Sequence, residues 1–153
     1  MELQAYFPNA TFISTTASNG KLLNFLTLLI AVIKLPCILI VNRKAIVHIH
    51  GASYNSFKRK KLLYQIIRLF GNKVVYHIHG AEFHDFFFKS TKKRQRKISN
   101  LINNVDCVIC LSLQWKQFFL TNFEPIKIEI LPNIVEEPTH LGLPISKTTF
   151  DFL

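Results

Sequence analysis

The pentapeptide HIHGA occurs twice in this chain, beginning at His48 and again at His77. Each copy ends a short run rich in β-branched residues, turns at a glycine and leads toward a segment with helical periodicity. This order is typical of β-α units. Because parallel strands end at the same edge of a sheet, we expect both HIHGA loops to lie together at the carboxyl edge.

Strands and helices are predicted to alternate along the rest of the chain. The expected strands are 11–15, 45–50, 73–79, 106–111 and 126–131, and the expected helices lie near 21–34, 57–70, 91–103 and 113–122. The connections are too long for hairpins, which predicts a three-layer α/β fold with a mostly parallel sheet and helices on both faces. With 153 residues, 49% of them apolar, the chain can form one domain with an ordinary core.

We expect that domain to occupy residues 1–135. An initial β-α unit is expected to be missing, because the chain opens with only a few residues before its first predicted strand. Residues 136–153 contain prolines, few charges and no clear period. They are interpreted as a linker toward an absent domain.

The stretch 22–41 is apolar and long enough to span a bilayer. Lys34 near its middle costs roughly 3 kcal/mol on membrane-insertion scales, and Pro36 interrupts the helix. We therefore expect a buried crossover helix that ends near Lys34. The chain lacks a signal peptide pattern and has three cysteines, which favours a reducing, cytoplasmic setting. Cys107 and Cys110 have CxxC spacing, but on a strand they would point to opposite faces.

The net charge of +10 is concentrated partly in two basic runs near the starts of predicted helices. The runs are Lys58, Arg59, Lys60 and Lys61, and Lys92, Lys93, Arg94, Arg96 and Lys97. If both face the same side, they predict docking on an anionic membrane surface, at the inner face of the membrane. A solvated helix face and a nucleic-acid-binding module are the alternatives. No RNA- or DNA-binding motif occurs, so nucleic acid is not the expected partner.

Other site chemistries find little support in the sequence. His77 and His79 share a strand face, as HxH pairs do in hydrolytic zinc sites, but the Asp-His pair that should follow directly is missing, and no metal is expected. The chain has no G-x-S-x-G elbow, no G-x-G-x-x-G fingerprint and no P-loop. Self-contained nucleotide binding is therefore not predicted.

Several segments, in this order and spacing, resemble the amino-terminal, acceptor-side domain of the family 4 glycosyltransferases, which have the GT-B fold. They are VHIHGAS (47–53), FKRKKLL (57–63), GNKVVYHIHGAEF (71–83), NVDCVICLSLQWK (104–116) and KIEILPNIV (127–135). The resemblance covers residues 11–135 and implies a Rossmann-like domain, one half of a GT-B fold.

The resemblance implies a retaining hexosyltransferase that moves a sugar from a nucleotide-sugar donor to a glycan or lipid-linked acceptor, in cell-surface polysaccharide biosynthesis and without a cofactor. By motif, His79 holds the position that the family places beside the transferred sugar, which makes it the expected catalytic residue. An imidazole can hydrogen-bond a sugar hydroxyl there. The expected acceptor-binding residues are His50, Gly51, Ser53, Gly80 and Glu82. We expect His48 and His77, one step back along their strands, either to pack or to support the site residues from behind.

The chain departs from the family in two places. It has no counterpart of the glycine-rich loop after the first strand, and none of the carboxyl-terminal donor domain. We therefore expect a fragment that needs a complementing carboxyl-terminal half and has no sugar-transfer activity alone. The competing hypothesis is a non-catalytic basic α/β module that binds anionic lipid or nucleic acid.

Overall fold

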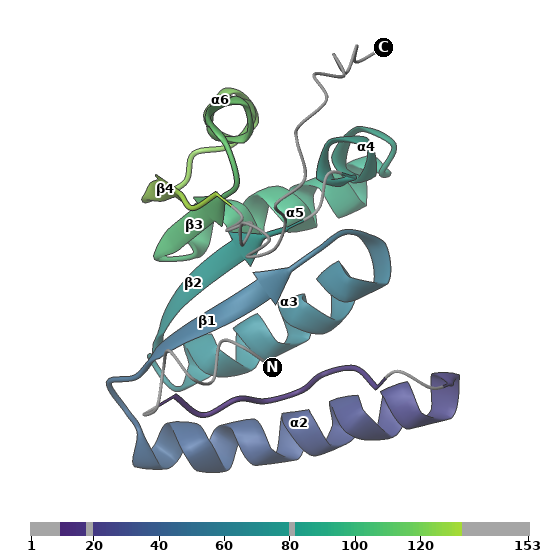
Figure 1. The fold of residues 1–153 in the computed structure, drawn as a ribbon, viewed down its shortest axis with the longest axis vertical. Coiled ribbons are helices and arrows are strands. Elements are labelled where there is room, and N and C mark those ends of the chain that lie inside the picture. The colour runs from purple at the N-terminus through teal and green to yellow at the C-terminus, as the bar shows by residue number, and fades with distance from the viewer. Residues whose placement is uncertain (1–9, 18–19, 80–81, 133–153) are drawn as a thin grey trace, which may run out of the picture.

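The computed structural model describes residues 10–17, 20–79 and 82–132. The elements in these ranges are α2 (Lys21–Val41), β1 (Ile46–Gly51), α3 (Tyr54–Leu69), β2 (Lys73–Ile78), α4 (Phe83–Phe88), α5 (Lys92–Asn104), β3 (Cys107–Cys110), α6 (Leu113–Asn122) and β4 (Ile128–Ile130). The four strands pair in the order β1-β2-β3-β4, and every pairing is parallel (Figure 1). The predicted Rossmann-like α/β class is confirmed, as is the parallel pairing of the two HIHGA strands.

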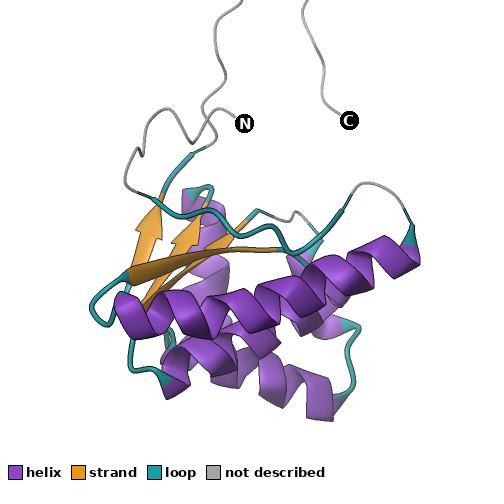
Figure 2. Ribbon diagram, turned by 90° about the horizontal axis from the view of Figure 1, so that it is seen from below, coloured by secondary structure: helices purple, strands orange, loops and turns teal. Residues whose placement is uncertain are grey.

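One face of the sheet carries the hydrophobic core. Val74, Tyr76 and Val108 on this face are each 0% exposed, and they pack with buried residues of α3 and α5 such as Ile67 and Ile98. In the view of Figure 2, the helices α2 and α3 lie on the lower side of the sheet, and segment 10–17 crosses its upper side. A helical layer on that upper face, as the three-layer prediction requires, is not among the described residues. The upper face is therefore where polar side chains of the strands remain accessible.

Residues 11–15 do not form the predicted strand. They have no regular secondary structure, although Ile13 packs against the core. Side chains take the place of a strand ladder: Lys60 Nζ donates to Thr15 Oγ1 at 2.7 Å, and Asn24 Oδ1 accepts from the Ala17 amide at 2.9 Å. A strand requires backbone pairing, which β-branched and aromatic composition alone does not supply.

Helix α2 is longer and more exposed than expected. It continues through Pro36 to Val41, and only Ala31, Leu35 and Leu39 of its residues are buried. The proline removes one backbone hydrogen bond, but apolar burial on both sides of it, by Leu35 and Leu39, keeps the helix continuous. The predicted buried helix ending near Lys34 is therefore wrong. By length and composition alone α2 could cross a membrane. The core helix of a soluble protein or a signal sequence meets the same criterion.

Two features at the strand ends were not predicted. The short helix α4 follows β2 and buries Phe83, Phe86 and Phe87, a helical spacing that the sequence contains but that was not recognised. At the other end, the side chain of Asn72, which is 1% exposed, donates to the carbonyl oxygens of Asn42 at 2.9 Å and Ala45 at 3.1 Å. This amide joins the turn before β1 to the start of β2.

Candidate functional site

Four histidines lie on the accessible face of strands β1 and β2. The register pairs His50 with His77 and His48 with Val75, so the second HIHGA copy is shifted along the sheet relative to the first. The shift is an even number of residues, and paired residues of a sheet point to the same face. His48, His50, His77 and His79 therefore form one staggered group on two strands.

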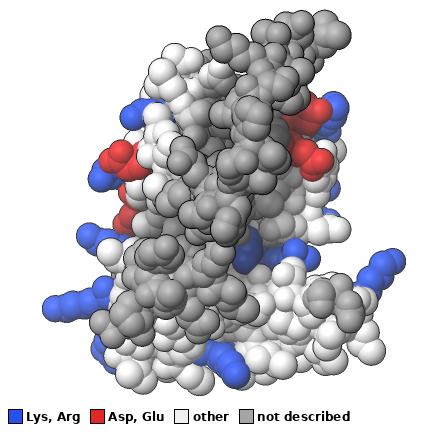
Figure 3. Space-filling view, in the orientation of Figure 1, with Lys and Arg blue, Asp and Glu red and all other residues white. Residues whose placement is uncertain are grey.

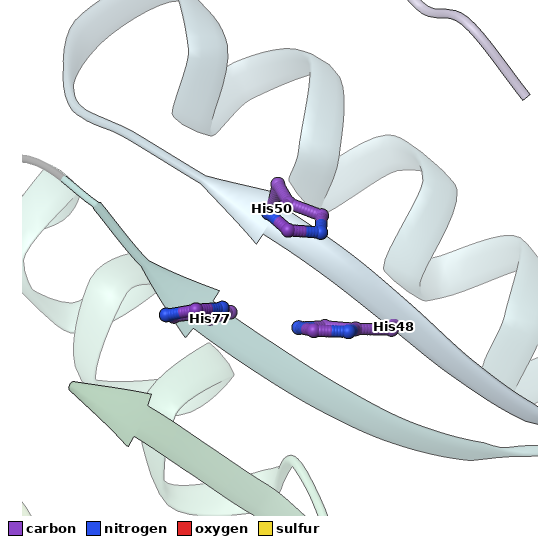
Figure 4. Close-up of side chains that lie close together, drawn as sticks. All are labelled: His48, His50 and His77. Atoms are coloured by element: carbon purple, nitrogen blue, oxygen red, sulfur yellow. The ribbon is translucent and has the colours of Figure 1, made fainter. Parts of the chain in front are cut away.

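The imidazole rings are in direct contact. His50 Nδ1 lies 2.8 Å from His79 Nε2, and the centroids of the His77 and His79 rings are 3.7 Å apart. His48 stacks on His50 with a centroid distance of 4.5 Å. The close-up shows His48 and His50 on β1 beside His77 on β2 (Figure 4). This group of four is called the histidine cluster below.

Burial and mutual repulsion keep the histidine cluster uncharged. Burial, followed by the neighbouring histidines, lowers the pKa of His77 to about 4. Burial also lowers the pKa of His50 to about 4, with further contributions from His48, His79 and Lys60. The pKa values of His48 and His79 are lowered as well, again mainly by burial. Near neutral pH these rings are neutral imidazoles that can donate one hydrogen bond and accept another.

The loop after β1 combines a close packing contact with local strain. A Cβ atom on Gly51 would clash with the ring of Tyr76, so the absence of a side chain is what lets this tyrosine fill the core under the loop. Ser53 is 8% exposed, and its hydroxyl has no hydrogen-bond partner among the described residues. Tyr54 has a φ of 52°, which is uncommon for a residue with a side chain. Such strain is often found at binding loops.

The other predicted acceptor residues are placed only in part. Gly80 lies outside the described residues. Glu82 is exposed and occupies the N-cap position of α4, without a side-chain capping hydrogen bond. Of the predicted set, the structure therefore brings the rings of His50 and His79 together. Gly51 and Ser53 follow His50 in the chain.

The two basic runs meet in a groove between α3 and α5. Two adjoining hollows share Lys61 and Lys97 in their linings, and the larger has a volume of about 450 Å³. The cations that line them, here called the basic groove, are Lys58, Lys61, Lys93, Arg94, Arg96 and Lys97. No acidic side chain lines it among the residues described.

Three basic residues of the two runs are not part of this groove. Lys60 donates to Thr15, and burial together with Arg59 lowers the pKa of Lys60. Arg59 has its Nε atom buried, and Lys92 is exposed outside the lining residues.

On the visible face, Lys and Arg lie without acidic neighbours in the lower part of the molecule, whereas Asp and Glu gather in the upper part (Figure 3).

His48 and His77 are the residues that the sequence interpretation undervalued. Both were expected to pack or to support the site residues, and the structure shows His48 exposed and the His77 ring near all three other histidine rings. The signal that could have identified them is the period of a strand, because residues two apart share a face. Cys107 and Cys110 alternate in burial along β3, in agreement with the prediction of opposite faces.

Comparisons with known proteins agree with the fold. Searches of curated proteins and of solved structures gave no significant match. The family model described as Glycosyltransferase Family 4 matches residues 10–137, which include every described strand and helix. On this match over most of its length, the chain belongs to glycosyltransferase family 4.

Proposed function

We propose that the chain is the acceptor-side half of a retaining hexosyltransferase. The complete enzyme transfers a sugar from a nucleotide-sugar donor to a glycan or lipid-linked acceptor, in the synthesis of cell-surface polysaccharide. In this proposal a carboxyl-terminal half supplies the donor site, and His79 contacts the sugar without help from a metal. The isolated chain then binds acceptor but does not turn over a nucleotide sugar.

The observation that carries this proposal is the contact between His50 and His79. The two rings come from the carboxyl ends of neighbouring parallel strands, where open α/β sheets bind their ligands. Both residues are accessible to solvent. Partial burial of their rings lowers both pKa values, so each ring is a neutral hydrogen-bonding group. A sugar hydroxyl both donates and accepts, which matches a pair of neutral imidazoles.

The proposal can be tested by following the histidine side chains in NMR spectra. The purified chain is titrated with uridine- and guanosine-diphosphate sugars, and separately with mono- and disaccharides on lipid-diphosphate carriers. We expect an acceptor to shift the His79 and His50 ring resonances, and His79→Ala to weaken its binding at least tenfold. His84→Ala, which changes an exposed histidine of α4, is the matched control and should bind as the unchanged chain does.

Two results would contradict the proposal. One is equal acceptor affinity in the His79→Ala and His84→Ala variants. The other is turnover of a nucleotide sugar by the isolated chain, because the proposal places the donor site in the carboxyl-terminal half.

We also propose that the basic groove docks on an anionic membrane surface and so holds the enzyme near a lipid-linked acceptor. Six cations from two helices line one continuous groove, and each can contribute roughly 1 kcal/mol near an anionic surface. Both runs contribute to the lining of the basic groove, which supports a common docking surface. The protein is then cytoplasmic and peripheral at the inner face of the membrane.

Vesicle co-sedimentation tests this docking. We expect the chain to bind phosphatidylglycerol vesicles and to release them as the salt concentration is raised. It should not bind phosphatidylcholine vesicles. The triple change Lys93→Gln, Arg94→Gln and Lys97→Gln should abolish binding. The triple change Lys73→Gln, Lys116→Gln and Lys127→Gln removes the same charge outside the groove and should weaken binding much less. If both triple variants lose vesicle binding equally, binding depends on net charge and not on the groove. Binding to duplex DNA but not to vesicles would favour a nucleic-acid-binding module.

A further inference from the structure

We propose that His48, His50 and His77 form a binding site for a divalent transition-metal ion, with Zn²⁺ as the reference ion. One ring nitrogen from each of the three residues lies within 4.8 Å of the other two (Figure 4). This departs from the expectation of no metal, which was based on the linear spacing of hydrolytic zinc sites. The site shares His50 with the proposed acceptor contact, but the binding of an ion can be measured without acceptor or donor.

The burial of His77 is the observation that points to a ligand. Its side chain is 4% exposed, and neither ring nitrogen has a hydrogen-bond partner in the described part of the chain. An unpaired buried polar group costs free energy, and native structures normally satisfy it. The rings of His48 and His50 lie on the same face, with centroids 5.3 and 5.4 Å from that of His77, and the His79 ring lies nearer, at 3.7 Å. A metal ion held between the three rings would satisfy His77.

The chemistry of the three ligands selects the class of ion. Imidazole nitrogen suits Zn²⁺, Co²⁺, Ni²⁺ and Cu²⁺, whereas Mg²⁺ and Ca²⁺ require oxygen ligands, which these three residues do not offer. A metal also requires neutral imidazoles, and the neighbouring rings already hold one another in that state. Three histidines leave a fourth tetrahedral position, which water can occupy.

The geometry requires a small contraction. At a Zn–N distance of 2.0–2.1 Å, the ligand nitrogens of a tetrahedral ion are about 3.3 Å apart. In the structure the three ring nitrogens lie up to 4.8 Å from one another. The difference can be closed by rotating the rings, because the terminal torsion of histidine is soft. The backbones need not move, since the ladder between β1 and β2 fixes His50 opposite His77. A rigid pair of strands with adjustable rings is a suitable frame for a metal site.

Metal competition with a chromophoric chelator tests the site, on chain without an affinity tag. We expect one Zn²⁺ per chain, no effect of Mg²⁺, and a visible spectrum of tetrahedral Co²⁺. His48→Ala and His50→Ala each leave His77 in place and should weaken Zn²⁺ binding at least tenfold. His84→Ala is the control and should bind normally.

A second measurement separates binding from folding. Zn²⁺ should raise the melting temperature of the unchanged chain and of His84→Ala, but not that of the double variant His48→Ala/His50→Ala, whose circular dichroism should be native. Absence of Zn²⁺ binding by the folded chain, or unchanged binding by that double variant, would overturn the proposal. Neither result would bear on the NMR test of acceptor binding with His79→Ala, so the two proposals can fail separately.

Discussion

The Nδ1 atom of His50 lies 2.8 Å from the Nε2 atom of His79. At this distance one nitrogen must carry a proton and the other must be free to accept it, so the tautomers of the two rings are linked. A ligand or metal that takes the lone pair of one ring fixes the proton of the other. The histidine cluster therefore responds to any ligand as a unit.

The lowered pKa values predict a loss of stability in mild acid. The folded-state pKa of His50 and of His77 is about 4, below the ordinary 6.5. The unfolded chain then binds more protons between these values, so stability is complete above pH 6.5 and declines as the pH falls toward 4. From pH 7.5 to pH 5 we expect the free energy of unfolding to fall by on the order of 2 kcal/mol, nearly all of it from the buried His77, because solvent screens the exposed His50.

Urea unfolding at both pH values, with a chelator present, measures this difference. His77→Phe should reduce the pH dependence, whereas His84→Ala should retain it. A pH dependence that is the same in His77→Phe and in the unchanged chain would show that the buried imidazole is not its source.

Gly51→Ala should destabilise the fold. The added methyl group would clash with the Tyr76 ring, which is 0% exposed and cannot move into solvent. We expect a loss of about 1–3 kcal/mol, typical of overpacking, in chemical denaturation. Tyr76→Val in the same chain opens space, so the double variant should lose less than the sum of the two single changes. Strict additivity would argue that the two residues do not compete for this space.

Asn72→Ala should weaken the connection between α2 and the sheet. The change removes two hydrogen bonds to the carbonyls of Asn42 and Ala45 and leaves both acceptors without this donor. A cost of about 2–3 kcal/mol is expected for such a buried amide. Asn104→Ala removes an exposed amide that bonds to Asn100 within the same helix, and it should cost much less. Thermal unfolding of the two variants compares them directly.

Pro36→Ala should stabilise α2. The new backbone N–H can bond to the carbonyl of Val32, and alanine is the better residue in a helix interior by about 3 kcal/mol, partly offset by a freer unfolded chain. We expect a higher melting temperature and slower amide exchange around residue 36. Cys37→Ala, at the exposed neighbouring position, is the control and should change little. A lower melting temperature in Pro36→Ala would mean that the proline ring is itself needed for packing.

The sheet was predictable because its signals are local. The two HIHGA copies, each ending an apolar run, predicted β1 and β2, their parallel direction and their common carboxyl edge. The register was not predictable, because it depends on how α3 crosses between the strands. The sequence alone therefore could not place His50 opposite His77 or show that all four rings touch.

The misses share a physical cause. Periodicity reports which side chains prefer burial, but it does not report which partner is present to bury them. Segment 11–15 has the composition of a strand without a backbone partner among the described residues, and α2 has the composition of a core helix with Leu22 and Phe25 exposed by 74% and 62%. Gly51 was interpreted as an approach for the acceptor, and its contact with Tyr76 depends on a residue from the neighbouring strand.

Strand β1 stands at the end of the order β1-β2-β3-β4, and no other described strand pairs with its outer side. In a parallel strand, successive amides point alternately to the two sides, so every second N–H of β1 lacks a sheet partner in the described part of the chain. Deuterium from solvent should therefore label β1 in an alternating pattern, with quick and slow sites one residue apart. Val75, Tyr76 and His77 of β2, paired on both sides, should all be slow, which gives the edge of this sheet a signature that can be observed without perturbing it.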